Sequence, residues 1–138
     1  MSGAARTNFD VPKKPGEWTL AQITEALSRP LPSTVLETKQ LENGRVIEYV
    51  PWHKAILLLN KYAPGWQWEI RQIYTTNEDL FLIGRLTIPT AEGLFYREAS
   101  GRNSLKDTGY GDASSNAESM AFRRAAAKFG LALYLYNK

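Results

Sequence analysis

The side chains best suited to chemistry are three cations close to the C-terminus. Arg123, Arg124 and Lys128 fall within six residues of one another. Arg124 and Lys128 are four residues apart, so they share one face if this segment is helical. Lysines and arginines grouped in this way bind the phosphates of a nucleic acid. A helix macrodipole also favours cations near its C-terminus by about 0.3–1 kcal/mol each, so the pattern is equally compatible with an ordinary helix end.

Lys54 is a cation in a less expected position. Pro51 predicts the start of a helix, because its missing N–H costs nothing in the first turn. Lys54 falls in that turn, which the unpaired N–H groups already make positive. An anion bound at the helix end would favour a lysine there. A long side chain reaching into water explains the same residue without any ligand.

Positive charge gathers toward the end of the chain. The formal net charge is +3, and residues 96–138 account for it with seven basic against four acidic side chains. The seven bases are Arg97, Arg102, Lys106, Arg123, Arg124, Lys128 and Lys138. A solvated surface explains a charge this small, so the bias gives weak support for an acidic partner such as nucleic acid.

Arginines and tryptophans also fall on or beside predicted strands. Three strands carry one arginine each: Arg71, Arg85 and Arg97. Period-two alternation puts Arg71 on the face of Glu69 and Ile73, opposite Trp68. We expect these arginines to solvate a sheet face or to pair with Glu69 and Glu98, with a DNA track across the sheet as the second reading. Most of the four tryptophans are expected in core or subunit packing, although stacking on bases is an alternative.

The sequence contains no recognisable catalytic motif. His53 is the single histidine and there is no cysteine, so a zinc finger or a His/Cys zinc enzyme cannot be built. Gly109 and Gly111 precede a predicted helix, but a P-loop requires lysine and Ser/Thr after its last glycine, where this chain has Asp112. The acidic residues show no spacing that singles out a metal site. We therefore predict a protein that is not an enzyme and needs no metal or other cofactor.

Length and composition indicate one globular domain. The chain has 138 residues, of which 43% are apolar, and no apolar run approaches the roughly 20 residues of a membrane span. Residues 1–16 are polar and proline-containing, which predicts a flexible arm before a domain at 17–136. The arm has no secretory signal core, and the absence of cysteine indicates a reducing compartment. These features predict a cytoplasmic protein, associated with the nucleoid if the source is bacterial.

Hydrophobic periodicity predicts an α+β fold. The expected elements are a helix at 17–28, a hairpin at 35–50, a helix from Pro51 to Pro64–Gly65, strands at 66–75, 80–89 and 94–100, and a helix at 115–129. Asn43–Gly44 predicts a type I′ turn that sets Glu42 opposite Arg45. Ser115 and Glu118 have capping-box spacing, and a glycine-rich loop at 101–113 leads into that helix. The short strand connections predict an antiparallel meander with a packed C-terminal helix.

One stretch is specific enough to suggest a family. The segment 110–130, which includes Tyr110-Gly111-Asp112, Arg123-Arg124-Ala125 and Phe129-Gly130, resembles the Rad52/Rad22-type single-strand annealing proteins. It looks closest to the bacterial branch that includes DNA-damage-response protein A. Upstream, the segments 49–54 and 65–68 resemble the same family's hairpin, helix and first long strand. The resemblance covers about residues 31–133.

The resemblance implies a β-β-β-α core whose copies join edge to edge into a ring or spiral. In that family single-stranded DNA lies in a basic groove, backbone inward and bases outward. Lys54, Arg123 and Arg124 match the basic residues of the groove. Where the family often has a further basic residue, this chain has Ala127, next to Lys128. The loop at 90–93 lacks the lysine that the family uses in a second DNA site.

These observations predict non-enzymatic, ATP-independent annealing of complementary DNA strands in recombinational repair, by a homo-oligomer. The predicted DNA-binding residues are Lys54, Arg71, Arg97, Arg102, Lys106, Arg123, Arg124 and Lys128. A single-strand-binding protein or a recombinase is a candidate partner, and no membrane contact is expected. Two alternatives stay open: a protein-interaction scaffold with a basic docking helix, and a metal-dependent nuclease.

Overall fold

The structure is a computed structural model that describes residues 10–41, 43–106 and 112–136. Its elements, in chain order, are α1 (Leu20–Leu27), the 3-10 turn η1 (Ser33–Val35), β1 (Glu37–Gln40), β2 (Val46–Tyr49), α2 (Trp52–Tyr62), β3 (Gln67–Thr75), β4 (Asp79–Thr90), β5 (Gly93–Ser104), α3 (Ala113–Lys128) and the 3-10 turn η2 (Leu133–Tyr136).

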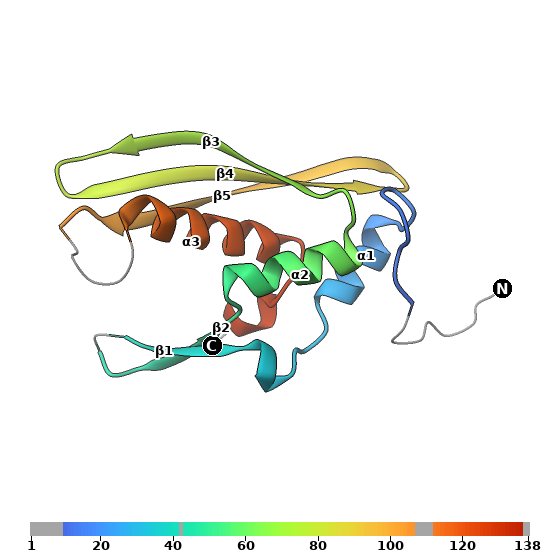
Figure 1. Ribbon diagram of the computed structural model, residues 1–138, viewed down its shortest axis with the longest axis horizontal. Coiled ribbons are helices and arrows are strands. Elements are labelled where there is room, and N and C mark those ends of the chain that lie inside the picture. Colours follow the sequence, from blue (N-terminus) through green and yellow to red (C-terminus); the bar gives the residue numbers. More distant parts are fainter. Residues whose placement is uncertain (1–9, 42, 107–111, 137–138) are drawn as a thin grey trace.

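The elements form three layers (Figure 1). The upper layer is an antiparallel sheet with strand order β3-β4-β5, and α3 runs along its lower face with α2 beside it. The β1–β2 hairpin is a separate two-stranded sheet on the far side of the helices. The predicted α+β class, with an antiparallel meander and a C-terminal packing helix, is confirmed.

Helix α3 lies very close to the sheet because both surfaces carry small residues. Ala117, Ala121 and Ala125 are fully buried on the face of α3 that meets β4 and β5. A Cβ added at Gly101 of β5 would stand 1.9 Å from the Ala117 carbonyl oxygen, a distance that no side chain tolerates. Glycine at this position therefore permits the close approach of helix and strand.

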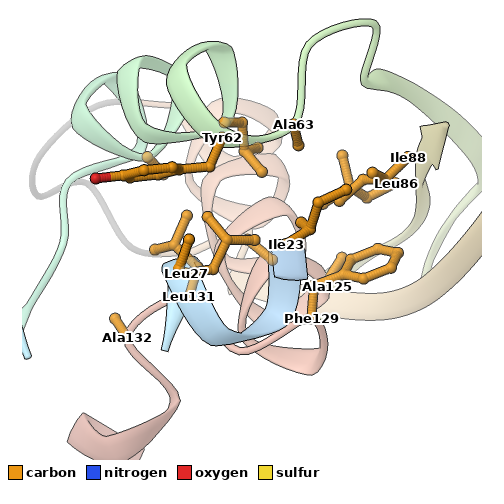
Figure 2. Close-up of a cluster of buried hydrophobic side chains, with 14 of the residues drawn as sticks. Ile23, Leu27, Tyr62, Ala63, Leu86, Ile88, Ala125, Phe129, Leu131 and Ala132 are labelled. Atoms are coloured by element: carbon orange, nitrogen blue, oxygen red, sulfur yellow. The ribbon is translucent and has the colours of Figure 1, made fainter. Parts of the chain in front are cut away.

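The hydrophobic core fills the space between the sheet and the helices at the α1 end (Figure 2). Ile23 of α1, Leu59 of α2, Leu86 and Ile88 of β4 and Phe129 are each at most 2% exposed. Burying an aliphatic or aromatic side chain of this size contributes about 1.5–3 kcal/mol, so this cluster holds the three long helices on the sheet.

Several predicted boundaries differ from the observed ones. β5 continues to Ser104, so Arg102 lies in the strand rather than in the predicted loop. α2 ends at Tyr62 with Pro51 as its N-cap, and Trp52 is 51% exposed, so it is not one of the tryptophans that pack in the core. A β-bulge between Ile70 and Gln72 shifts the register, which places Ile73 opposite Leu82 on the inner face and separates it from Arg71.

The hairpin turn is one residue longer than predicted. The Leu41 N–H donates to the Arg45 carbonyl at 2.7 Å, so Leu41, and not Glu42, faces Arg45. Gly44 has φ +85°, and a three-residue loop with one left-handed glycine closes a hairpin as well as a type I′ turn does. Glu42 itself lies outside the described residues.

The start of α3 also differs from the prediction. Asp112 is the N-cap and its carboxylate accepts from the Ser115 N–H at 2.7 Å. The predicted box of Ser115 and Glu118 does not form, because the helix begins at Ala113 and the Glu118 carboxylate accepts from the Trp68 indole at 2.9 Å. A capping box occurs instead at the start of α1, between Thr19 and Gln22.

The predicted arm at 1–16 stays a prediction. Residues 1–9 lie outside the described part of the chain, whereas Pro12 is buried and Val11 packs against the core. Among the described residues, no helix has the length and apolarity required to cross a bilayer.

Candidate nucleic-acid interface

Two cations, Lys54 and Arg123, contact the segments that flank the β1–β2 hairpin. The Lys54 ammonium donates to the Thr34 carbonyl at 2.9 Å, just before β1. The Arg123 guanidinium lies 5.0 Å from the centre of the Tyr49 ring, and its Nε donates to the Ser119 carbonyl at 3.2 Å. We call Lys54 and Arg123 the hairpin-side cations, because their partners lie just before and at the end of the β1–β2 hairpin.

A cavity of about 270 Å³ lies next to these cations. It is lined by the whole of β2 and also by Arg45, Ala55, Arg123 and residues of the C-terminal segment. Ala55 follows Lys54 in the first turn of α2, so the start of α2 and the middle of α3 border one space. Two basic residues, Arg45 and Arg123, and one acidic residue, Glu48, thus line an otherwise largely apolar cavity.

Three other cations contact the outer edge of the sheet. Arg124 donates to the Ser100 carbonyl at 3.2 Å and Lys128 to the Glu98 carbonyl at 2.6 Å. Arg97 donates to the Tyr96 carbonyl at 2.9 Å and lies 4.9 Å from the centre of the Phe129 ring. We call Arg97, Arg124 and Lys128 the edge cations. They lie along β5, whereas Arg123 contacts Tyr49 of β2.

The remaining candidates lie elsewhere. Arg71 pairs with Glu69 at 3.6 Å and with Glu98 at 3.8 Å on the outer face of the sheet. These are the partners expected from the sequence, where a DNA track was the second reading. Arg102 pairs with Asp79 at 3.2 Å, and Lys106 follows the end of β5 with its side chain exposed. The structure therefore does not bring the eight predicted residues onto one surface.

Arg85 belongs to the same outer face as Arg71. Its guanidinium donates to Glu98 at 2.8 Å and stacks 4.1 Å from the centre of the Tyr96 ring. Exposed ion pairs of this kind contribute about 0–1 kcal/mol each to stability. They nevertheless neutralise the positive charge of this face, which weakens its attraction for phosphate.

The pairing of charges separates these surfaces. Within the described residues, Lys54, Arg123, Arg124 and Lys128 have no carboxylate within 4.0 Å, whereas Arg85 and Arg102 each have one and Arg71 has two. Neutral carbonyl oxygens and a ring face hold the first four side chains. A phosphate can replace such partners without leaving an unpaired carboxylate behind.

An aromatic cavity lies between the starts of α2 and α3. Trp52, Trp66, Trp68 and Phe122 line this space of about 320 Å³ together with Glu118. The ring of Trp68 meets Phe122 edge-on with centroids 5.2 Å apart. Sequence periodicity did not reveal this cavity, because it assigned Trp52 to the core and Glu118 to a helix cap.

Asp112 is the one described group with a clearly shifted pKa. The hydrogen bond from the Ser115 backbone N–H lowers the pKa of its carboxyl, and the Ser114 hydroxyl lowers it further. The carboxylate thus stabilises the first turn of α3. The Gly109-Tyr110-Gly111 motif just before it lies outside the described residues, and no group of three or more His, Asp or Glu side chains able to hold a metal occurs among those that are described.

Comparison with known proteins identifies the family. The family model of the Rad52/22 family double-strand break repair protein matches residues 19–138. The chain is 38% identical over 137 residues to the DNA repair RAD52-like protein 1, mitochondrial, of Arabidopsis thaliana, covering 98% of this chain and 77% of that protein. This chain belongs to the Rad52/22 family. It is also 34% identical over 122 residues to the DNA repair RAD52-like protein 2, chloroplastic, of the same plant, covering 86% of this chain and 61% of that relative.

The family resemblance inferred from the residues is thereby confirmed, and the chain is a Rad52-family DNA repair protein. The comparison does not confirm the bacterial branch, which stays a prediction. The predicted cytoplasmic location is wrong, because both relatives are named for an organelle. Absence of cysteine distinguishes reducing from oxidising compartments, but it does not distinguish the cytosol from the interior of a mitochondrion or plastid.

Proposed function

We propose that this protein binds single-stranded DNA and anneals complementary strands without nucleotide hydrolysis, as a homo-oligomer. The observation that carries the proposal is the set of cations that have no carboxylate partner among the described residues. Lys54 contacts η1 just before β1, Arg123 contacts Tyr49 at the end of β2, and Arg124 extends from the next position of α3. We assign phosphate contacts to these three residues, with Lys128 beside them.

The chemistry of annealing needs charge neutralisation and no catalyst. Base pairing is favourable by itself, but two strands carry like charges and repel each other. Cations that bind the backbone reduce this repulsion and leave the bases accessible to a second strand. A few contacts per subunit bind weakly, and linked copies multiply that binding through effective concentration.

The ion-paired arginines are excluded from the proposed site. A phosphate at Arg71 or Arg102 would compete with Glu69, Glu98 or Asp79, which repel it. Arg97 and Lys106 stay predicted contacts of lower rank, because Arg97 is held against Phe129 and Lys106 lies beyond the end of β5. This ranking makes Arg71 and Arg102 useful controls.

The test is a fluorescence annealing assay with complementary oligonucleotides and no ATP. We expect the Lys54→Ala/Arg123→Ala variant to anneal slowly and the Arg71→Ala/Arg102→Ala variant, which removes the same charge, to anneal like the wild type. Equal loss in both variants would show that net charge, and not this site, drives annealing. Magnesium-dependent strand cleavage would instead support a nuclease, and failure of the wild type to retain oligo(dT) at low salt would support a scaffold.

The proposed setting is recombinational repair in an organelle, which the names of the two plant relatives support. A single-strand-binding protein or a recombinase remains the partner we propose. Co-purification of either with the tagged protein from organelles, resistant to nuclease treatment, is the measurement that tests this.

A further inference from the structure

The two edges of the large sheet differ in what occupies them. β5 is an edge strand, since β4 pairs with it on one side and, in the described part of the chain, no other strand lies on the other. In an antiparallel ladder, the backbone groups of alternate residues point to the same side. The Leu105 N–H donates to the Glu78 carbonyl at 2.7 Å and continues this ladder, so odd-numbered residues of β5 face β4. Tyr96, Glu98 and Ser100 therefore direct their carbonyls toward the free edge.

These three successive free-edge carbonyls are each occupied by an edge cation. Arg97 donates to Tyr96, Lys128 to Glu98 and Arg124 to Ser100, at 2.9, 2.6 and 3.2 Å. Two of the donors come from α3 and one from β5 itself. A strand added at this edge would need the same carbonyls, so the cations compete with it directly.

The edge of β3 has no such cover. Seven consecutive residues, 69–75, are exposed, and among the described residues no side chain hydrogen-bonds to the backbone of β3. The Thr76 N–H donates to the Asp79 carbonyl at 2.8 Å, which sets the ladder so that Gln72 and Tyr74 face β4. Ile73 and Thr75 thus direct their N–H and carbonyl groups outward, and Ile73 is also 51% exposed.

We propose that Arg97, Lys128 and Arg124 guard the β5 edge against strand addition by the open β3 edge of a second copy. Each copy then carries one open edge and one guarded edge, so assembly requires the guards to leave their carbonyls. Exposed hydrogen bonds of this kind are individually weak, so a second copy can displace them. Their combined strength sets the protein concentration at which copies join. The inference rests on the homo-oligomer part of the proposed function, and it is tested without DNA because Arg124 and Lys128 also belong to the proposed phosphate site.

The first test measures the association of the full chain by sedimentation velocity over a concentration series without DNA. Lys128→Met and Arg97→Met keep much of each side chain and remove the donor. We expect the double variant to associate at a concentration lower by about fivefold for each hydrogen bond removed. Arg29→Met/Lys61→Met, which removes the same charge from the segment after α1 and from α2, should associate like the wild type.

A second change separates strand addition from non-specific association. Ile73→Pro removes an outward N–H and leaves the β3–β4 ladder intact, so it should reverse the gain when added to the double variant. Ile73→Ala, which removes the side chain alone, should not. Unchanged or weaker association of the double variant would overturn the proposal. Stronger association would also overturn it if Ile73→Pro did not reverse the increase, or if the Arg29→Met/Lys61→Met control showed the same increase.

Hydrogen exchange tests the same proposal in the unmodified chain. The outward amides of Glu98 and Ser100 should exchange quickly in dilute protein and become protected above the association concentration, together with that of Ile73. Protection at neither edge would overturn the proposal. Oligo(dT) binding measured on the same samples keeps the two proposals apart, because a loss of DNA binding leaves these exchange results unaffected.

Discussion

The hairpin-side cations and the edge cations begin as one cluster in the chain and end on different surfaces. Arg123 and Arg124 are adjacent, yet successive residues of a helix point about 100° apart. Arg123 therefore reaches Tyr49 on the hairpin, and Arg124 reaches Ser100 on the sheet edge. Adjacent positive residues on this helix thus belong to two different surfaces. The element packed beside each surface decides which groups the side chain contacts.

The largest expected effect concerns the hairpin-side pair. Lys54→Ala/Arg123→Ala should weaken binding to single-stranded DNA of every sequence by at least about tenfold, because charge-assisted hydrogen bonds contribute about 1.5–3 kcal/mol each. The log–log slope of affinity against salt should fall by about 0.7 for each phosphate that the variant no longer neutralises. Fluorescence anisotropy at several salt concentrations measures both quantities. If Arg97→Ala/Lys128→Ala weakened DNA binding equally, the hairpin-side cations and the edge cations would contribute alike to DNA binding.

A change on the sheet tests whether α3 must approach closely for the edge cations to act. Gly101→Ala places a methyl group against the Ala117 carbonyl, so we expect about 1–3 kcal/mol of destabilisation in urea unfolding. Displacement of α3 should also lengthen the hydrogen bond between Arg124 and Ser100. Gly44→Ala, which meets no atom within 4 Å but strains a positive φ, is a control for backbone effects. A fully stable Gly101→Ala protein would show that the helix lies further from the sheet.

A single substitution distinguishes the two neighbours on α3. Arg124→Ala should weaken DNA binding alike for all sequences and lower the salt slope by the equivalent of about one phosphate per subunit. The same substitution should promote association of copies, since it also removes one guard from β5. An unchanged salt slope would show that Arg124 is not part of the DNA site. Its only proposed role would then be at the β5 edge.

The smallest effect is expected at the opposite end of α3, where neither group of cations lies. The pKa of Asp112 is lowered in the folded protein, so its stabilising contribution is present above the unfolded pKa and is lost as the pH falls through the folded value. Asp112→Asn retains a capping side chain and should reduce the acid dependence of the melting temperature slightly. Thermal melts at pH 7 and in mild acid measure this, and an identical pH profile in both proteins would exclude the cap as a source of it.

Much of the fold follows from local patterns in the chain. Alternating apolar residues and short turn segments predicted the three strands of the meander, and helical spacing predicted all three helices. The errors lie where a distant partner overrides a local preference. Glu118 has the spacing of a helix cap but bonds to Trp68 of β3, and a bulge reverses the face of Ile73. Neither partner is near in sequence, so local spacing could not indicate it.

The candidate site shows the same division. The sequence by itself indicated cations grouped on two helices and a resemblance to the Rad52 family, which the comparisons confirmed. Tertiary structure alone decided which cations share a surface, because a carboxylate, a carbonyl or a ring comes near each one only through packing. Arg71 and Arg123 are equally basic in the sequence, and the glutamates of the sheet neutralise the first while the hairpin leaves the second without a carboxylate partner among the described residues.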